Sequence, residues 1–375
     1  MTGSKAPRRI ALAVYRLAPA GGLEQHALRL AAILVRRGCA VTMITTRPAA
    51  QPPSAGVEVE LVASRGSTNH GRLAAFADDA SRAIADRFDR TVAFHAIPGF
   101  DAIFCADPSR ASPAGPKQWL PRYRSYAELE RRALASGAGP VLMLSSAQLR
   151  AFAANHPGAR SRLNLLPPTV DRLRADPAGA SPEARSAARA TFALDAYPVW
   201  LWMGLQAKTK GLDRVLQAMP AASDARLLVC GLDPASRSGA DARRLATRLG
   251  VEDRVRWLGF VGDEALAAAM AAADLLVHPS RADVTGTVIL EAMANGVPVI
   301  TTALCGYGEH VVAAGAGIVL DEPFEASALS RALAEATEDA LVTWSANALA
   351  YAGRDELFSG LERAADLILA AEPGR

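Results

Sequence analysis

Two acidic residues in the second half of the chain, Asp283 and Glu291, lie eight positions apart. Asp283 immediately precedes, and Glu291 lies within, a predicted helix that connects two short apolar strands. We expect Thr285, Gly286 and Thr287 to form the first turn of this helix, where backbone N–H groups bind phosphate. A carboxylate accepts hydrogen bonds from the vicinal hydroxyl groups of a sugar. The stretch therefore predicts a site for a diphosphate flanked by a ribose and a second polyol.

Glu291 has an ordinary interpretation beside the functional one. Charged residues of a helix usually face solvent. Glu291, however, stands among Ile289, Leu290, Ala292 and Met293 in the sequence. These apolar neighbours favour a carboxylate that is held at a binding site.

Two lysines follow another predicted strand, VWLWMGL. A positive charge on Lys208 or Lys210 would neutralise a leaving diphosphate without a metal ion, although lysines in a loop are also common on any protein surface. No acidic pair of the DxD type stands at a suitable position. A metal-independent reaction is therefore expected.

Gly21 and Gly22 separate the first predicted strand from the first predicted helix. Glycine allows a phosphate to approach the backbone closely, but a Gly-Gly pair before a helix is more often an ordinary turn. The pair is not part of a GxGxxG motif, and the second strand does not end in an acidic residue. Both facts argue against a dinucleotide-dependent dehydrogenase.

An alternation of predicted strands and helices, interrupted once, must position these residues. The proline-rich stretch 165–198 separates two runs of this alternation and is predicted to be a linker. Such runs predict parallel sheets covered by helices, and 375 residues are enough for two domains. We expect an α/β protein with two Rossmann-like, doubly wound domains and an interdomain cleft. The expected boundaries are 1–170, 171–345, and 346–375 for a C-terminal helix that packs back on the N-terminal domain.

Positive charge is concentrated in the first half. Residues 1–170 hold 22 Lys and Arg against 11 Asp and Glu, a net +11, whereas 171–375 hold 19 against 27, a net −8. This split indicates an anionic partner for the first half, with drift in surface composition as the alternative. Aromatic residues make up only 6% of the chain and suggest no stacking platform, so nucleic acid is not an expected partner.

The four cysteines, Cys39, Cys105, Cys230 and Cys305, are far apart and form no CxxC motif. Each has apolar neighbours, so buried free thiols in a reducing compartment are expected. The first residues lack the pattern of a signal peptide, and no apolar stretch is long enough to cross a bilayer. A cytoplasmic location is therefore predicted.

Aromatic and basic residues alternate in the segment 116–132. Trp119 and Tyr123 stand beside Arg122 and Arg124, a mixture that suits a lipid headgroup region. The alternative is an exposed loop followed by an ordinary amphipathic helix. The positive first half favours contact with an anionic membrane surface.

Residues 283–299 resemble the E-x7-E motif of retaining GT-B glycosyltransferases. The resemblance extends in order along nearly the whole chain to one subgroup, the lipopolysaccharide core glucosyltransferases that add the first glucose to inner-core heptose. The strings that carry it include GGLEQHALRLA (21–31), TNHGRLAAF (68–76), IPGFDAIFCAD (97–107) and TTALCGYGEH (301–310).

This resemblance implies a GT-B fold and a UDP-sugar site in the C-terminal domain, with UDP-glucose as donor substrate and no cofactor. It implies Glu291 at the ribose, Lys210 at the pyrophosphate and Asp283 at the hydroxyl groups of the transferred sugar. It also implies the following positions: Gly21 and Gly22 near the diphosphate from the N-terminal side, Arg172 and Lys208 near the phosphates, Gly231 and Val261 around the uracil, and Asp107 near the acceptor.

The implied reaction is transfer of glucose by front-face substitution to lipopolysaccharide core, on the cytoplasmic side of the inner membrane, with Asp283, Lys210 and Asp107 as catalytic residues. Asp283 is one methylene shorter than the glutamate usual in the family, which leaves the donor sugar open. A GT-B transferase that uses another UDP- or GDP-sugar for a glycolipid or capsule is one alternative. A non-catalytic GT-B scaffold is another.

Overall fold

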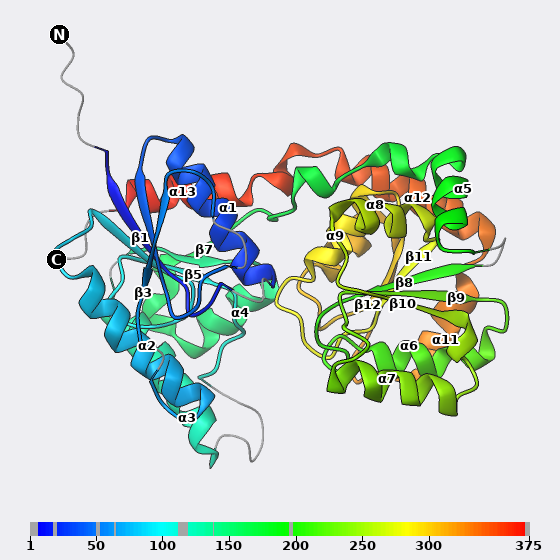
Figure 1. Cartoon of the computed structure of the whole chain (residues 1–375), viewed down its shortest axis with the longest axis horizontal. Coiled ribbons are helices and arrows are strands. Elements are labelled where there is room, and N and C mark those ends of the chain that lie inside the picture. Colours follow the sequence, from blue (N-terminus) through cyan, green and yellow to red (C-terminus); the bar gives the residue numbers. More distant parts are fainter. Residues whose placement is uncertain are drawn as a thin grey trace, which may run out of the picture. The chain divides into compact units, whose positions relative to one another are not determined.

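The computed structural model describes residues 7–17, 21–49, 53–63, 65–111, 119–137, 139–194 and 198–371. The chain forms two compact units, which are labelled by their elements in Figure 1. Unit 1 comprises Met1–Thr169 and Ser359–Arg375, and unit 2 comprises Val170–Phe358. Each unit holds a parallel sheet with helices on both faces, so the predicted α/β class with two doubly wound domains is confirmed.

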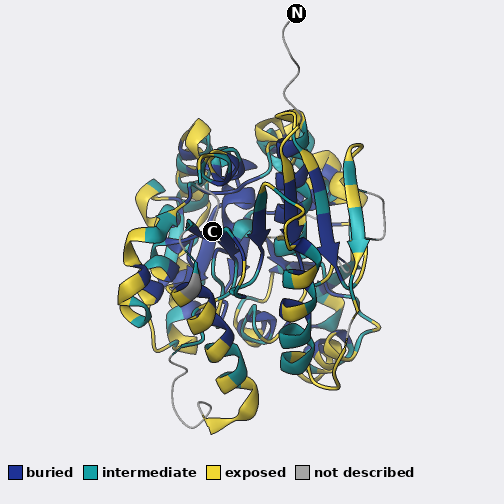
Figure 2. Cartoon of the chain, turned by 90° about the vertical axis from the view of Figure 1, so that its left-hand side faces the viewer, coloured by how far each residue is buried: buried dark blue, intermediate teal, exposed yellow. Residues whose placement is uncertain are grey.

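Unit 1 contains a seven-stranded sheet in the order β3-β2-β1-β4-β5-β6-β7, and its described strands pair in parallel. The order reverses between β1 and β4, which makes this position the topological switch point. In Figure 2 the middle strands are dark blue, whereas the edge strand β3 has only half-buried and exposed residues. The strands are β1 (Arg9–Ala13), β2 (Ala40–Thr45), β3 (Val57–Leu61), β4 (Arg90–Ala93), β5 (Ala102–Cys105), β6 (Val141–Met143) and β7 (Leu163–Leu165).

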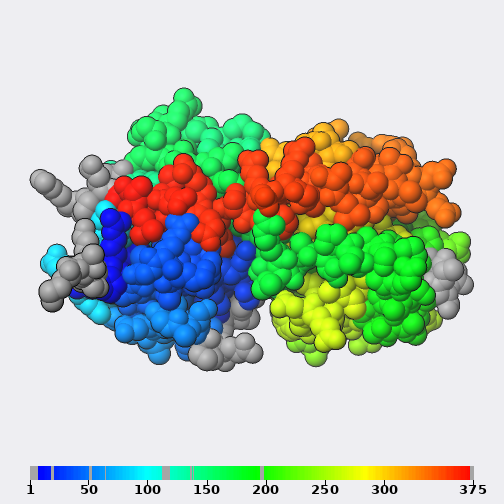
Figure 3. All heavy atoms as spheres, turned by 90° about the horizontal axis from the view of Figure 1, so that it is seen from above, coloured from blue at the N-terminus to red at the C-terminus, as the bar shows by residue number. Residues whose placement is uncertain are grey.

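The helices of unit 1 include one from the far end of the sequence. Helix α13 lies against α1, as Figure 3 shows in red and blue. Arg37, the C-cap of α1, donates hydrogen bonds to Asp366 at 2.7 Å and to Glu362 at 2.5 Å. The helices are α1 (Gly22–Arg36), α2 (Asn69–Ile84), α3 (Pro121–Ser136), α4 (Ser146–Asn155), α13 (Gly360–Ala370) and the 3-10 helix η2 (Pro157–Arg162).

Unit 2 contains a six-stranded parallel sheet in the order β10-β9-β8-β11-β12-β13, with its switch point between β8 and β11. Strand β8 is buried on both faces because its residues alternate between two cores. Val199, Leu201 and Met203 belong to one core, and Trp200 and Trp202 to the other. The strands are β8 (Val199–Met203), β9 (Arg226–Cys230), β10 (Val255–Gly259), β11 (Leu275–His278), β12 (Val299–Thr302) and β13 (Gly317–Leu320).

The helices of unit 2 cover both faces of this sheet. They are α5 (Pro182–Thr191), α6 (Leu212–Ala218), α7 (Arg237–Arg248), α8 (Asp263–Ala272), α9 (Thr287–Ala294), α10 (Gly308–Ala314), α11 (Ala326–Glu335) and α12 (Glu338–Ala352). Short 3-10 helices lie between them: η3 (Arg172–Arg174), η4 (Pro177–Ala180), η5 (Met219–Ala221), η6 (Glu252–Arg254) and η7 (Asp355–Phe358). None of the helices in the described part of the chain is long and apolar enough to cross a membrane.

The C-terminal boundary of unit 2 differs from the expected one. The expected boundary at 345/346 falls inside α12, whose residues Ala348 and Tyr351 are buried in a core of unit 2. The chain returns to unit 1 only at Ser359. There the N–H of Gly360 donates to the carbonyl of Pro168 at 3.0 Å. An apolar helical pattern alone does not reveal which of two cores a helix joins.

The stretch 165–198 contains the first crossing between the units, but most of it is folded. Helix α5 is tied to the start of β11, since Arg185 and Arg189 each donate a 2.6 Å hydrogen bond to the carboxylate of Asp274. The linker proper is therefore shorter than the sequence suggested. Cys105, Cys230 and Cys305 are buried, as predicted, whereas Cys39 is half-buried.

His26 of α1 is a buried histidine that couples the stability of unit 1 to pH. It is 6% exposed, and its Nε2 lies 2.8 Å from Thr169 Oγ1. Burial, together with the nearby charge of Arg29, lowers the pKa of His26 from 6.5 to about 4. The unfolded chain therefore protonates His26 more readily than the folded protein does. As a result, the contribution of neutral His26 to the stability of the folded state is complete above pH 6.5 and is lost as the pH falls towards 4.

We expect the free energy of unfolding to fall by about 3 kcal/mol over this pH range on account of His26 alone. In His26→Gln this part of the pH dependence should disappear. Urea unfolding at several pH values measures it, with His70→Gln, a partly exposed histidine of α2, as the control. Equal pH dependence in wild type and His26→Gln would show that His26 does not titrate in this way.

Candidate active site

The residues predicted to bind the donor in unit 2 follow successive strands of its sheet. In a parallel sheet the carboxyl ends of the strands meet at one edge, where α/β proteins bind ligands. The structure therefore brings the predicted residues to a common edge. In chain order they are Lys208 and Lys210 after β8, Gly231 after β9, Val261 after β10, Asp283 after β11, and Thr285, Gly286, Thr287 and Glu291 at the start of α9 and within it.

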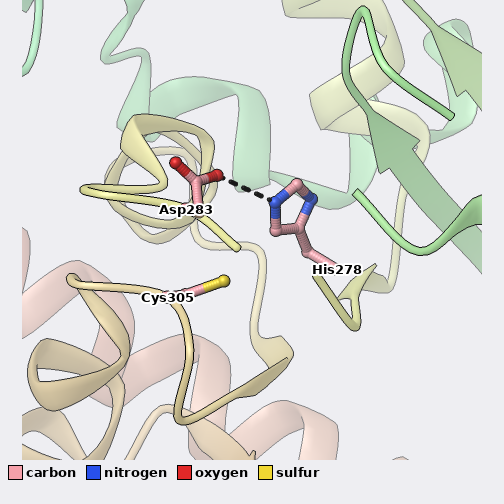
Figure 4. Close-up of side chains that lie close together, drawn as sticks. All are labelled: His278, Asp283 and Cys305. Carbon is pink, nitrogen blue, oxygen red and sulfur yellow. Dashed lines mark hydrogen bonds and ion pairs between the residues drawn. The ribbon is translucent and has the colours of Figure 1, made fainter. Parts of the chain in front are cut away.

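Lys210 and Asp283 meet at the switch point between β8 and β11. The ammonium group of Lys210 contacts Asp283 Oδ2, and His278 Nε2 lies 3.3 Å from the same oxygen (Figure 4). Burial raises the pKa of Asp283, but the hydrogen bond from His278 and the charge of Lys210 outweigh it and lower the pKa from 3.8 to about 2. Asp283 is therefore ionised at neutral pH. Its negative charge lies beside the positive charge of Lys210.

The loop that carries Lys210 is held in place by its surroundings. Trp202 Nε1 donates to the carbonyl of Lys210 at 3.0 Å. Gly211 has a φ of 76°, and a Cβ at this position would lie 2.1 Å from the carbonyl oxygen of Pro279, so only glycine fits. The backbone N–H of Arg281 donates to the carbonyl of Thr209 at 2.7 Å. The backbone at Lys210 is thus preorganised, while its side chain remains 23% exposed.

Lys208 does not join this contact. Its side chain is exposed, and its carbonyl accepts a 2.5 Å hydrogen bond from Arg281. Arg281 also forms a bidentate ion pair with Asp213 at 2.7 Å. The role of Lys208 at the phosphates stays a prediction.

A second loop fixes the backbone of Asp283. Asp283 N donates to the carbonyl of Leu304 at 3.1 Å, and Gly306 N donates to the carbonyl of Asp283 at 3.0 Å. Tyr307 N donates to the carbonyl of Thr285 at 2.7 Å. The string CGY at 305–307, which the sequence analysis noted only as part of a resemblance, therefore positions Asp283 through its backbone.

The start of α9 differs from the predicted one. The helix begins at Thr287, and Gly286 is its N-cap in the left-handed conformation with a φ of 75°. Thr285 lies outside the helix, because Gly286 turns the chain before the first helical residue. The N–H groups of Thr287 and Val288 are in the first turn, where the helix supplies no acceptor of its own. A diphosphate would find its donors there.

Glu291 is not a solvated helix residue. It is 7% exposed, and its Oε1 lies 3.4 Å from Arg174 Nη1. Arg174 Nη2 also lies 3.4 Å from Asp263 at the start of α8. Asn295 fixes this arrangement, because its Nδ2 donates to the carbonyls of Arg174 at 2.7 Å and Glu291 at 2.8 Å. Binding of ribose by Glu291 stays a prediction.

Arg174 was not predicted from the sequence, whereas Arg172 was. Arg172 forms an ion pair with Asp355 and stacks on the ring of Phe358, with Cζ 4.4 Å from the ring centre. Arg174, two residues later, contacts Glu291 instead. These contacts do not test the predicted position of Arg172 near the phosphates, which stays a prediction.

Gly231 and Val261 lie at the ends of β9 and β10. Gly231 has a φ of 86°, and its N–H donates to the carbonyl of Gly259 at 2.7 Å. The backbone conformation alone thus requires glycine there. Val261 is half-buried and packs against a core of unit 2. Their place around a uracil ring stays a prediction.

The switch point of unit 1, between β1 and β4, holds the other predicted glycines. Gly21 is the N-cap of α1, and its N–H donates to Glu24 Oε2 at 2.9 Å. A Cβ added at Gly22 would meet no atom of the described residues within 4 Å, and the φ of Gly22 is not among the positive values. The fold therefore does not require glycine at position 22. Among the described residues, nothing fills the space beside Gly22 at the N-terminus of α1, as close approach of a phosphate would need.

Asp107, predicted near the acceptor, follows β5 and pairs with a residue that follows β4. Its Oδ2 lies 3.1 Å from His95 Nδ1, and its Oδ1 lies 3.5 Å from Arg110. Burial raises the pKa of Asp107, but His95 and Arg110 outweigh it, so that the net pKa is lowered. The carboxylate remains 42% exposed and is able to meet a ligand.

A buried acid that the sequence analysis did not single out, Glu130 of α3, holds the loop that carries Asp107. Glu130 is 2% exposed and accepts hydrogen bonds from Ser109 Oγ at 2.7 Å, Arg110 N at 2.6 Å and Ala111 N at 3.2 Å. His156 Nε2 lies 2.7 Å from the same carboxylate. Glu130 lies on the face of α3 that also carries the buried residues Leu129, Ala133 and Leu134. This helical spacing was the signal in the sequence that could have identified Glu130 as buried.

The residues predicted to contact a membrane lie at the start of α3. Trp119 is 75% exposed, Arg122 and Arg124 are exposed, and Arg122 Cζ lies 4.7 Å from the centre of the Tyr123 ring. Part of the predicted segment, 116–118, lies outside the described residues. Membrane contact stays a prediction.

Comparison with known proteins agrees with this geometry. The family of glycosyl transferases group 1 matches residues 187–356. The lipopolysaccharide glucosyltransferase WaaG of Escherichia coli K12 is 32% identical over 376 residues, which cover 96% of this chain and 98% of that protein. The chain belongs to the glycosyltransferase family that these two matches identify.

Solved structures agree with the assignment as a glycosyltransferase. The crystal structure of WaaG aligns with a TM-score of 0.87 at 30% identity, over 96% of this chain and 100% of that one. Anabaena Alr3699/HepE, solved in complex with UDP-glucose, aligns with a TM-score of 0.75 at 21% identity, over 97% of this chain and 99% of that one, and shows the shared fold. The enzyme thus has the predicted GT-B fold.

Proposed function

We propose that this glycosyltransferase moves glucose from UDP-glucose to the inner-core heptose of lipopolysaccharide, with retention of configuration. The observation that carries the proposal is the contact between Lys210 and Asp283 at the carboxyl edge of the unit 2 sheet, with the buried Glu291 in the helix that follows. The similarity to a lipopolysaccharide glucosyltransferase over nearly the whole chain supports the acceptor class.

In this proposal the bound donor draws the ammonium of Lys210 from Asp283 onto its diphosphate. The first-turn N–H groups of α9 bind the same phosphates. Asp283, released from Lys210 and still hydrogen-bonded to His278, accepts hydrogen bonds from hydroxyl groups of the sugar. Glu291 accepts them from the ribose, with Arg174 holding its carboxylate.

The transfer itself is proposed to be a front-face substitution. The acceptor hydroxyl attacks the anomeric carbon on the face from which the diphosphate leaves, and a leaving phosphate oxygen takes the hydroxyl proton. The developing negative charge of the diphosphate is stabilised by Lys210 and by helix N-termini. Asp107 of unit 1, with its lowered pKa, orients the acceptor by accepting hydrogen bonds from its hydroxyl groups.

Donor profiling tests the proposal. Turnover and slow hydrolysis of UDP-glucose are compared with those of UDP-galactose, UDP-GlcNAc and GDP-mannose, in the wild type and in Asp283→Ala. We expect selective use of UDP-glucose, which Asp283→Ala abolishes while nucleotide binding remains. Preference for another donor would contradict the choice of glucose, and Asp283 in place of glutamate is the feature that makes this comparison necessary. Tight nucleotide binding without turnover of any donor would support a scaffold instead.

The reaction is proposed to need no metal ion. The ammonium group of Lys210 lies beside Asp283. It supplies the positive charge that a divalent ion supplies in other transferases. We expect full activity in excess chelator. Loss of activity that Mg²⁺ or Mn²⁺ restores would contradict this prediction.

The enzyme is proposed to work at the cytoplasmic face of the inner membrane, bound through the start of α3. Removing the charges of Arg122 and Arg124 by substitution with Gln should weaken binding to phosphatidylglycerol vesicles by roughly 30-fold, because each basic residue near an anionic surface contributes about 1 kcal/mol. Vesicle co-sedimentation measures this. Arg243→Gln/Arg244→Gln on α7 removes equal charge from exposed positions of unit 2, and an equal loss there would exclude a specific role for α3.

A further inference from the structure

Three side chains at the edge of the unit 2 sheet direct different ligand atoms towards one point. They are His278 at the end of β11, Asp283 in the following loop and Cys305 after β12. An imidazole nitrogen, a carboxylate oxygen and the thiol sulfur lie within 4.8 Å of one another. Figure 4 shows the thiol of Cys305 beside the hydrogen-bonded pair of His278 and Asp283.

The backbone holds these residues close together whether or not an ion is present. Asp283 and Cys305 form an isolated parallel bridge between their loops. The carbonyl of His278 accepts a 2.9 Å hydrogen bond from Thr301 Oγ1 on the neighbouring strand. His278 is 1% exposed and Cys305 is 3% exposed, so neither side chain has access to a wide range of rotamers. A ligand set fixed by tertiary structure costs little ordering entropy on binding.

The donor set selects the class of ion. Nitrogen, oxygen and sulfur ligands together suit Zn²⁺ and similar transition-metal ions. Mg²⁺ and Ca²⁺ prefer oxygen ligands alone. Three protein ligands would leave a fourth position of a tetrahedral ion for water or for a phosphate oxygen.

Two features limit the affinity of such a site. The ammonium of Lys210 contacts Asp283 and competes with an ion for its carboxylate. The second ring nitrogen of His278, Nδ1, is buried without a hydrogen-bond partner among the described residues. Metal-binding histidines usually have such a partner, which orients the ring. The ion should therefore bind more weakly than in a structural zinc site.

We propose that His278, Asp283 and Cys305 form a binding site for a thiophilic divalent ion such as Zn²⁺, and that the bound ion inhibits the enzyme. The thiol loses its proton to solvent on binding, and the ion takes the place of the Lys210 ammonium at Asp283. Asp283 is then no longer available to the sugar hydroxyl groups. The inhibitory part rests on the proposed function, whereas the binding part does not.

Titration of the full chain with Co²⁺ tests binding without any assay of activity. A thiolate bound to Co²⁺ gives a charge-transfer absorption band in the near ultraviolet. We expect a band that saturates at one equivalent, is retained in Cys39→Ser and is lost in Cys305→Ser. Cys39 is the matched control, because it is the half-buried thiol and lies in unit 1. Cys305→Ala serves as a second variant if the serine at this buried position impairs folding.

Absence of the band in the wild type would overturn the proposal, as would a band that persists without Cys305 or disappears without Cys39. Inhibition is then tested with Zn²⁺ and Mg²⁺ on donor turnover. We expect Zn²⁺ to inhibit the wild type, with an inhibition constant at least roughly tenfold higher in the Cys305 variants, and Mg²⁺ to have no effect. A Co²⁺ band without Zn²⁺ inhibition would refute the inhibitory part alone. Failure of every donor in metal-free enzyme would refute the proposed function, and the Co²⁺ spectrum would still decide the site.

Discussion

Replacing Lys210 with methionine is expected to lower kcat for transfer from UDP-glucose by about 10²–10³-fold, the usual effect of removing one preorganised group that stabilises developing charge. Methionine keeps the aliphatic part of the side chain, which lies beside Gly204. The loop is also held by bonds that do not involve the ammonium, such as that from Trp202 Nε1 to the carbonyl of Lys210. The substitution therefore removes charge with little change in structure.

Lys208→Met is the matched control for this prediction. Lys208 lies two positions earlier in the same loop, and its side chain is exposed. Lys208 is predicted near the phosphates, but an exposed charge pair contributes no more than about 1 kcal/mol, so kcat should fall by less than roughly fivefold. Steady-state kinetics with donor and acceptor measure both variants. Equal losses in the two would mean that the loop contributes only general positive charge, and no loss in Lys210→Met would remove Lys210 from the mechanism.

Replacing Glu130 with alanine is expected to destabilise unit 1 by about 3–5 kcal/mol, because each buried donor left without an acceptor costs about 1–3 kcal/mol. The substitution leaves His156 and the N–H groups of Arg110 and Ala111 without their buried acceptor. Ser109 loses its bond as well. Urea unfolding followed by circular dichroism measures the change.

Glu128→Ala is the control on the same helix. Glu128 is exposed and pairs with Arg131 on the surface, so its loss should cost less than about 1 kcal/mol. The local consequence of Glu130→Ala is faster amide hydrogen exchange in residues 107–111, the loop that carries Asp107. Equal destabilisation by the two substitutions would show that the buried contacts of Glu130 contribute no more than a surface pair.

Much of the fold was predictable because buried strands leave a simple signal. Segments such as VWLWM are apolar throughout, as strands covered on both faces must be, and the alternation with helices determined the parallel class. The site at the carboxyl edge followed from the same rule. The start of helix α9 did not follow, because Thr285, Gly286 and Thr287 were assigned to its first turn. Gly286 instead adopts a left-handed conformation as the N-cap, so the helix begins at Thr287, two residues later than expected.

The residues missed in the site owe their roles to contacts between distant segments. Arg174 is 117 positions from Glu291 in the sequence, and the neighbouring Arg172 was the more visible candidate. His278 was not singled out, because it ends β11 and only the loop that follows this strand brings Asp283 to its ring. Glu130 was missed because α3 carries several other charged residues, most of which are exposed. Local patterns record which face a residue occupies, but not which loop the tertiary structure brings to it.

The discontinuity of unit 1 has a consequence for biosynthesis. Unit 2 is a single uninterrupted segment, Val170–Phe358, whereas unit 1 is completed only by α13. As the chain leaves the ribosome, the surface of α1 that receives α13 stays uncovered until all of unit 2 has been made. Domains fold as units during synthesis, normally with the N-terminal one first. Here the second unit is the first that can reach its final form, and the nascent N-terminal unit must persist without α13 while the 189 residues of unit 2, Val170–Phe358, are made.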